Sequence, residues 1–115
     1  MSRLITVASA QLGPIEREES KDSVVKRMTD MMRHAHDRGA RLVVFPEMAL
    51  TTFFPRWHIE DEAELDAFYE TEMPSAQTQP LFDLAKELGV GFYLGYSEMF
   101  FDDDSKKRRF NTAIL

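Results

Sequence analysis

Residues 41–47 read Arg-Leu-Val-Val-Phe-Pro-Glu, and this stretch decides the fold. The unbroken apolar run from Leu42 to Phe45 predicts a strand buried on both faces, as in a parallel sheet. Pro46 cannot donate to a sheet ladder, so the strand ends there, and Glu47 is the first charge after it. In open α/β sheets the binding crevice lies at the carboxyl ends of strands. The sequence therefore predicts an active-site edge at Glu47.

The stretches before this strand predict a β-α-β unit. Residues 4–11 combine β-branched and small side chains, which favours a first strand, and Gly13-Pro14 signals a turn. Between residues 20 and 38 the apolar positions recur at steps of three and four, which is typical of one face of an amphipathic helix. Gly39 supplies the expected C-cap. Because such units almost always join parallel strands by a right-handed crossover, the predicted fold class is α/β.

The second half of the chain predicts further helices and a hairpin. In order, we expect a short helix that begins near Asp61 and is ended by Met73-Pro74-Ser75, a helix from the N-cap Thr78 to Gly89, a strand over 90–96, a turn over 102–106 and a last strand over 109–115. The glycines within 90–96 indicate close approach of a neighbouring backbone. We expect the last two strands to be antiparallel.

Length and composition limit the function. A chain of 115 residues with 43% apolar side chains is enough for one domain with a real core. A net charge of −6 argues against nucleic-acid binding, which needs a basic face. The one basic run, 106–109, directly follows three aspartates, so we expect these charges to neutralise each other across a turn.

Targeting signals and cysteine content further limit the location and chemistry of the protein. No apolar run approaches the roughly 20 residues that span a bilayer, and the N-terminus lacks a signal-peptide cleavage pattern, which predicts a cytoplasmic protein without membrane contact. The chain has no cysteine, which excludes disulfides, cysteine-type zinc sites and thiol nucleophiles within these 115 residues. It ends on three apolar residues without a polar fringe, so we expect it to be the N-terminal fragment of a longer protein.

The histidines do not predict a metal site. His34 and His36 are two residues apart on the expected helix and point in different directions, and His58 precedes an acidic stretch without a recognised ligand spacing. We interpret all three as surface or partly buried histidines. No phosphate-binding glycine loop and no Gly-x-Ser-x-Gly elbow is present.

Glu47 is the remaining candidate for a catalytic residue. Burial beside Phe45, Phe53 and Phe54 would destabilise its charged form and suit it to act as a general base. The alternative is a solvated loop carboxylate, and spacing alone does not choose between the two.

A resemblance adds to this interpretation. Residues 45–47, Phe-Pro-Glu, after a first strand that ends in Ala10-Gln11, resemble the nitrilase or carbon-nitrogen hydrolase superfamily. Residues 49–74, Ala-Leu-Thr-Thr-Phe-Phe-Pro-Arg-Trp-His and onward to Glu-Met-Pro, are similar to its N-carbamoyl-D-amino-acid hydrolase branch, as are residues 108–112, Arg-Arg-Phe-Asn-Thr. The resemblance covers nearly the whole chain.

The resemblance implies an enzyme that hydrolyses an N-carbamoyl-D-amino acid to the D-amino acid, carbon dioxide and ammonia, without a metal or organic cofactor. It implies a Glu-Lys-Cys triad in which Glu47 is the general base, with the lysine and cysteine beyond Leu115. Phe53, Phe54 and Trp57 either pack within their loop or form an aromatic wall for the substrate. Alternatives are another carbon-nitrogen hydrolase, of amidase or β-ureidopropionase type, and a non-catalytic α/β binding or subunit protein.

The same resemblance implies a four-layer αββα sandwich whose protomers pair, so that the full-length protein is a homo-oligomer. Residues 1–115 would be the N-terminal portion of one such domain, with one sheet face lacking its partner sheet. We expect this chain alone to be inactive, because it has no cysteine, and to be marginally stable or prone to aggregation.

Overall fold

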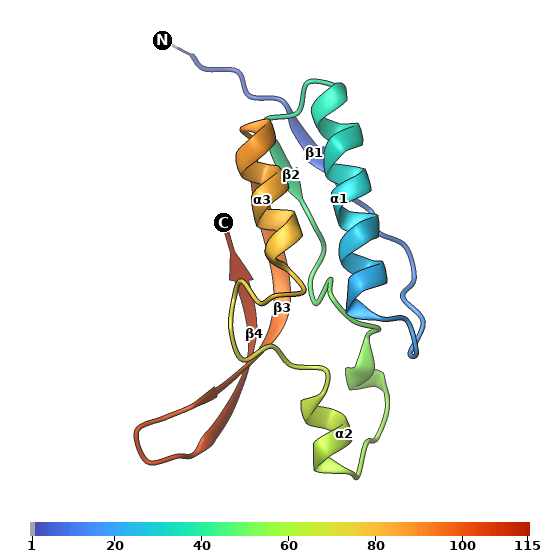
Figure 1. The fold of residues 1–115 in the computed structure, drawn as a ribbon, viewed down its shortest axis with the longest axis vertical. Helices are drawn as coiled ribbons and strands as arrows, with labels where there is room; N and C mark the ends of the chain where they lie inside the picture. The colour runs from blue at the N-terminus through green and yellow to red at the C-terminus, as the bar shows by residue number, and fades with distance from the viewer. Residues whose placement is uncertain (1) are drawn as a thin grey trace.

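The computed structural model describes residues 2–115, which form a mixed α/β fold around one four-stranded sheet (Figure 1). The strands are β1 (Val7–Ser9), β2 (Leu42–Val44), β3 (Gly91–Phe101) and β4 (Lys107–Ile114), in this spatial order. β1, β2 and β3 are parallel, and β4 is antiparallel to β3. The predicted α/β class, the parallel unit around β2 and the terminal hairpin are confirmed.

The two long helices begin and end where their caps predict. α1 (Lys21–Asp37) starts at Ser20, whose hydroxyl oxygen accepts a hydrogen bond from the Ser23 backbone N–H at 3.1 Å. α3 (Gln79–Leu88) starts at Thr78, although that side chain does not cap the helix, and ends at Gly89 with φ of 65°. This left-handed conformation is strained for residues with a Cβ, so glycine is the natural stop.

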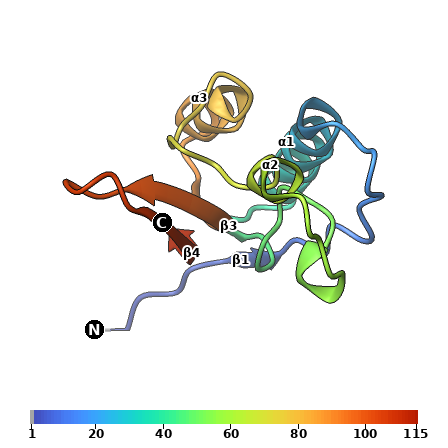
Figure 2. The same ribbon diagram turned by 90° about the horizontal axis from the view of Figure 1, so that it is seen from below.

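Both helices cover the same face of the sheet, and Figure 2 shows them side by side above it. The side chains between them and the sheet are almost completely buried: Val24, Met28, Met32, Val43, Phe45, Leu81 and Leu94. The ring of Phe92 joins the layers, because it meets Phe45 and Phe82 edge-on at 6.5 and 5.1 Å. Apolar burial on this face supplies the main stabilisation of the fold.

The opposite face of the sheet is exposed along β1, β2 and the start of β3, whereas further along β3 Ser97 and Met99 on this face are only 5% and 9% exposed. Val7 and Tyr93 point to this side and are 55% and 38% exposed, and Leu42 and Val44 are only half-buried. The prediction that β2 is buried on both faces is therefore wrong for this chain. The strand alternates instead, because within residues 2–115 helices α1 and α3 pack on one side only.

The connecting elements differ from prediction in extent. α2 (Glu62–Asp66) begins as expected at Asp61, whose carboxylate accepts from the Ala63 and Glu64 backbone N–H groups, but it ends well before Met73. A short 3₁₀ turn over Phe54–Arg56 was not predicted. β1 and β2 are shorter than their apolar patterns suggested, and β3 is longer because β4 pairs with it as far as Phe101, while Glu70 forms a parallel bridge with Glu98.

None of the helices in the part of the chain described, residues 2–115, is both long and apolar enough to cross a bilayer. The cytoplasmic location stays a prediction.

Candidate active site at the end of strand β2

The loop that carries Glu47 is fixed to β3 at both ends. The Phe45 backbone N–H donates to the Tyr93 carbonyl at 2.9 Å, and the Ala49 N–H donates to the Gly95 carbonyl at 2.9 Å. Between these bonds the chain turns through Met48, which has φ of 47°, an uncommon conformation for a residue with a Cβ. Glu47 is therefore held on a tightly constrained turn at the carboxyl end of β2.

Gly95 makes this turn possible. A Cβ added to Gly95 would lie 2.8 Å from the Glu47 Cα and 3.0 Å from the Pro46 carbonyl oxygen. Both neighbours are backbone atoms, which cannot move aside without shifting the whole turn. The close backbone approach predicted from the glycines of this strand is confirmed at Gly95.

The Glu47 carboxylate is exposed, so of the two alternatives left open by the sequence the structure shows a solvated carboxylate and not one buried beside three phenylalanines. Phe45 points into the core under the helices, where it is 1% exposed. Phe54 is 2% exposed and stacks on Phe68 at 4.8 Å between ring centroids. Glu47 is instead held by Asn111 of β4, whose side-chain amide donates to Glu47 Oε1 at 2.5 Å.

A cavity of about 320 Å³ opens beside Glu47. Its walls are the turn over 46–49, the segment 12–16, and the side chains of Phe53 and Arg56. Three aromatic residues were predicted either to pack within their loop or to form a substrate wall; of these, Phe53 lines this cavity, and Phe54 and Trp57 do not. The Trp57 ring lies under two guanidinium groups, those of Arg17 and Arg56, at 4.8 and 4.6 Å from its centroid.

Four charged side chains attach α2 to the hairpin, and we call them the α2 clamp: Glu62, Asp66, Lys107 and Arg109. Lys107 Nζ lies 2.5 Å from Asp66 and 2.9 Å from Glu62, and Arg109 lies 2.6 and 3.2 Å from the same carboxylates. The pKa of Glu62 and that of Asp66 are both lowered, and the main cause is the hydrogen bond that each carboxylate accepts from Lys107. Hydrogen bonding to Asp66 raises the pKa of Lys107 and of Arg109.

The α2 clamp corrects one expectation. The basic run was predicted to be neutralised by the aspartates of the adjacent turn, and Arg108 does pair with Asp102 at 3.2 Å. Lys107 and Arg109 instead point to the other side of the strand, because side chains alternate along β4, and pair with a helix about 40 positions earlier in the chain.

A second, more buried contact joins α1 to β3. Lys21 Nζ lies 2.6 Å from Oε1 of Glu70, whose residue is only 5% exposed, and the Glu70 backbone N–H donates to the Ser97 carbonyl. Nearby, the Tyr96 hydroxyl donates to Glu98 at 2.9 Å. Burial, and then this hydrogen bond, raise the pKa of Tyr96 to about 12.

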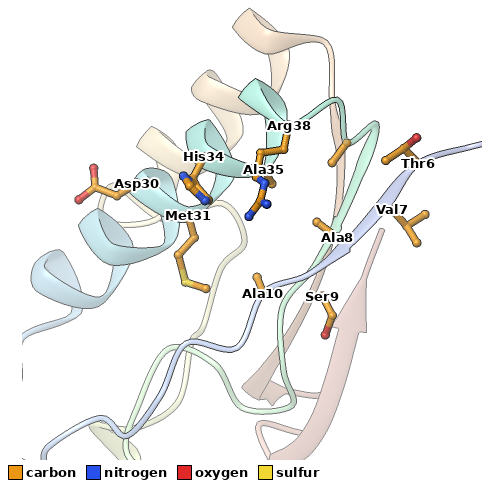
Figure 3. A pocket seen from close by; sticks show the side chains of 11 residues that line it. Thr6, Val7, Ala8, Ser9, Ala10, Asp30, Met31, His34, Ala35 and Arg38 are labelled. Atoms are coloured by element: carbon orange, nitrogen blue, oxygen red, sulfur yellow. The ribbon is translucent and has the colours of Figure 1, made fainter.

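A larger cavity of about 570 Å³ lies along β1 (Figure 3). One wall is the segment over residues 6–10, which contains β1, and the other is α1 with its C-cap Arg38; Met31 and Arg38 line this second wall (Figure 3). Within residues 2–115, β1 pairs with β2 alone, so this cavity follows an open sheet edge. It contains no residue of the turn that carries Glu47.

The histidines are separate from one another. His34 lines the larger cavity, His36 Nδ1 lies 3.6 Å from Asp37, and His58 Nε2 lies 3.8 Å from Glu60. In the described range 2–115, no three His, Cys, Asp or Glu side chains gather in the manner of a metal site.

Sequence reasoning assigned no role to Asn111, although a signal was present. Asn111 is the one asparagine of the chain, and it lies in a strand, where asparagine is disfavoured. A polar residue that is unfavourable in its own element indicates a specific contact, here with Glu47.

Comparison with known families agrees with this architecture. Residues 6–115 match the family model described as carbon-nitrogen hydrolase, which accounts for nearly all of the chain. The four-stranded mixed sheet with its helices is consistent with an N-terminal part of the nitrilase fold. A hydrolase of this kind acts on a small molecule, and the chain belongs to the carbon-nitrogen hydrolase family.

Proposed function

We propose that Glu47 is the general base of a hydrolase that acts on N-carbamoyl-D-amino acids. The observation that carries the proposal is the position of Glu47: an exposed carboxylate on a constrained turn, at the carboxyl end of a parallel strand and beside a cavity. Membership of the carbon-nitrogen hydrolase family supports the reaction class. The resemblance of residues 49–74 and 108–112 to the N-carbamoyl-D-amino-acid hydrolases supports the substrate.

The reaction consumes one water and converts the ureido group into a free amine, carbon dioxide and ammonia. In the proposed mechanism Glu47 accepts the proton of a cysteine thiol, and the thiolate forms a bond to the ureido carbon. The carbonyl oxygen becomes an oxyanion, which a lysine stabilises. As the oxyanion collapses, the bond from the ureido carbon to its terminal nitrogen breaks, and this nitrogen takes the proton from Glu47 and leaves as ammonia, while the carbamoyl group stays on the sulfur. Water then attacks the carbamoyl carbon with Glu47 again as the base, the thiol is released, and the carbamate formed loses carbon dioxide to give the free amine. Because the chain contains no cysteine, we propose that the thiol and the lysine come from residues outside 1–115.

The cavity beside Glu47 suits such a substrate. Phe53, which is 54% exposed, offers an apolar wall for the substrate side chain. Arg56 lines the same cavity, and its positive charge attracts the carboxylate that every N-carbamoyl amino acid carries, without a direct bond between the two groups.

The test is ammonia release by the protein translated from the complete reading frame that contains these residues. N-carbamoyl-D-phenylalanine should be hydrolysed faster than its L-enantiomer, N-carbamoyl-β-alanine or a simple aliphatic amide. Glu47→Gln should lower kcat by roughly 10²–10⁴-fold, the usual contribution of a positioned base. Glu87→Gln, an exposed carboxylate on α3, is the matched control and should change nothing.

Different results identify the alternatives. Faster hydrolysis of the β-alanine derivative or the amide would be compatible with Glu47 as the base, but it would refute N-carbamoyl-D-amino acids as the substrate class. No hydrolysis of any of these compounds would favour a non-catalytic subunit. Residues 1–115 alone should release no ammonia from N-carbamoyl-D-phenylalanine, and release by the purified chain would refute the requirement for an external thiol.

A further inference from the structure

Asn111 reaches Glu47 across the full width of β3. It lies on β4 opposite Ser97, two residues beyond the Gly95–Ala113 pair. Gly95, Ser97 and Asn111 alternate onto the same face of the sheet, the face over which the 46–48 turn passes. Because Gly95 has no side chain, nothing stands between the turn and β4, and the Asn111 amide meets Oε1 of Glu47.

The backbone of Glu47 is fixed, but its side chain is not fixed by packing. The turn is held by two hydrogen bonds to β3 and by contact with Gly95. The carboxylate itself is exposed, and a glutamate side chain has several freely rotating bonds. Among residues 2–115, the Asn111 amide is the one hydrogen-bond donor to that carboxylate. It therefore decides where the carboxylate points.

An amide is well suited to this task. Its nitrogen donates to a carboxylate at every pH, since it neither titrates nor offers a proton that Glu47 could remove. It adds no charge that would compete with a substrate or a thiolate. It also binds a single oxygen, so Oε2 of Glu47 has no protein donor in the described part of the chain and is left to accept a proton.

We propose that Asn111 is the positioning residue of the base: it holds Oε1 of Glu47 so that Oε2 faces the reacting group. This inference rests on the proposed function of Glu47, but the contact itself can be tested without any substrate. Small misplacements of a reacting group cost on the order of 10²-fold in rate, so a residue that orients the base has a large effect on kcat without touching the substrate.

The first experiment measures the contact in the 115-residue chain. Because Asn111 is the only asparagine, selective ¹⁵N-asparagine labelling gives one side-chain amide signal with no assignment problem. Its proton shifts should change as the pH falls through the range in which carboxylates protonate. Glu47→Gln should abolish this response, and Glu87→Gln should leave it intact. A response that persists without the Glu47 carboxylate, or no response at all, would refute the contact.

The second experiment measures the consequence in the protein from the complete reading frame, with whichever carbon-nitrogen substrate it hydrolyses. Asn111→Ala should lower kcat by roughly 10–100-fold and leave KM within about twofold, because the substrate itself loses no contact. Arg108→Ala, a larger truncation on the same strand that faces away from Glu47, should change neither constant. A parallel loss of kcat in Arg108→Ala would mean that β4 matters only as structure.

The isosteric variant gives the sharpest test. Asn111→Asp keeps the shape of the side chain but places a second carboxyl group against Glu47. Two such groups share one proton at low pH, and the protonated aspartate can still donate. The variant should therefore approach normal kcat/KM at the acid end and lose it as pH rises, with a steeper alkaline loss than the wild type. An unchanged pH profile would overturn the proposal.

These outcomes separate the two claims. If the amide signal follows Glu47 but no compound is hydrolysed, the contact stands and the proposed function fails. If hydrolysis depends on Glu47 but not on Asn111, the function stands and the positioning role fails.

Discussion

The two ends of this molecule are held together by different forces. The helix-covered end, made of β1, β2, α1 and α3, is stabilised by apolar side chains that are almost fully buried, such as Met28 and Phe45. The hairpin end, made of α2 and the far parts of β3 and β4, is stabilised by the charged α2 clamp and by aromatic stacking around Phe54.

The difference matters because the candidate site lies between the two ends. Glu47 follows β2, which belongs to the apolar end, and Asn111 belongs to the hairpin. Hydrophobic burial is non-directional and holds β2 rigidly in place, whereas ion pairs are directional and depend on pH and salt. The position of Glu47 thus depends on the core, and the orientation of its carboxylate depends on how the hairpin is held.

The largest expected effect tests the apolar end. Phe45→Ala removes a ring that is 1% exposed and packs on Phe92, so it should lower the free energy of unfolding by about 3–5 kcal/mol. Phe53→Ala, a ring that is 54% exposed, should change it by no more than about 0.5 kcal/mol. Urea unfolding followed by circular dichroism measures both values, and comparable losses would contradict the division between core and surface.

An intermediate effect tests the junction of the two ends. Gly95→Ala forces a Cβ against the Glu47 backbone and should cost about 1–3 kcal/mol in the free energy of unfolding. Gly91→Ala on the same strand is the matched control, since its Cβ would meet the flexible Leu42 side chain at 3.4 Å. Gly95→Ala should also remove the pH response of the Asn111 amide. An unchanged amide response would show that the turn tolerates a side chain beneath it.

The smallest effect tests the hairpin end and appears as a pH dependence. The pKa of Glu62 and that of Asp66 are lowered in the folded protein, so their stabilisation is complete above their ordinary values of 4.5 and 3.8 and is lost as pH falls through the lower folded values. The pKa of Lys107 is raised, so its contribution is complete below 10.5 and is lost only above that. The contribution of the α2 clamp to stability should therefore be constant between these limits.

The measurement is the urea midpoint at low salt, from neutral pH down through the acid range in which Glu62 and Asp66 become protonated. Combining Glu62→Gln with Asp66→Asn should make the acid decline shallower than in the wild type, and added salt should reduce the difference between the two proteins. Because all four groups are close to solvent, the effect at neutral pH should be small. An identical acid decline in the double variant would show that the α2 clamp does not hold the hairpin end.

Local signals predicted most of the fold. α1 and α3 were placed to within a residue or two because their periodicity, capping residues and terminal glycines all agree. The hairpin followed from its turn residues. The strands were less well bounded, since a strand ends where its partner ends: β3 extends to Phe101 because β4 and Glu70 pair with it, and neither fact can be read from residues 90–96.

The candidate site was predicted only in part. Glu47 could be found because a proline and a charge interrupt an apolar run, and this is a local pattern. Its exposure, its partner Asn111, the cavity with Arg56 and the pairing of Lys107 with Asp66 all join residues that are far apart in sequence. Of the aromatic residues considered for a substrate wall, only Phe53 lines the cavity. Phe54 turns away because it stacks on Phe68, a contact that a local pattern cannot predict.

The sequence by itself determined the α/β class, the order of the elements and the position of the candidate base, because periodicity, caps and turn residues act over a few neighbouring positions. The tertiary structure alone decided that Gly95 admits the Glu47 turn and that Asn111 orients its carboxylate. Strand register brings these residues together, and register is set by contacts between segments rather than within them.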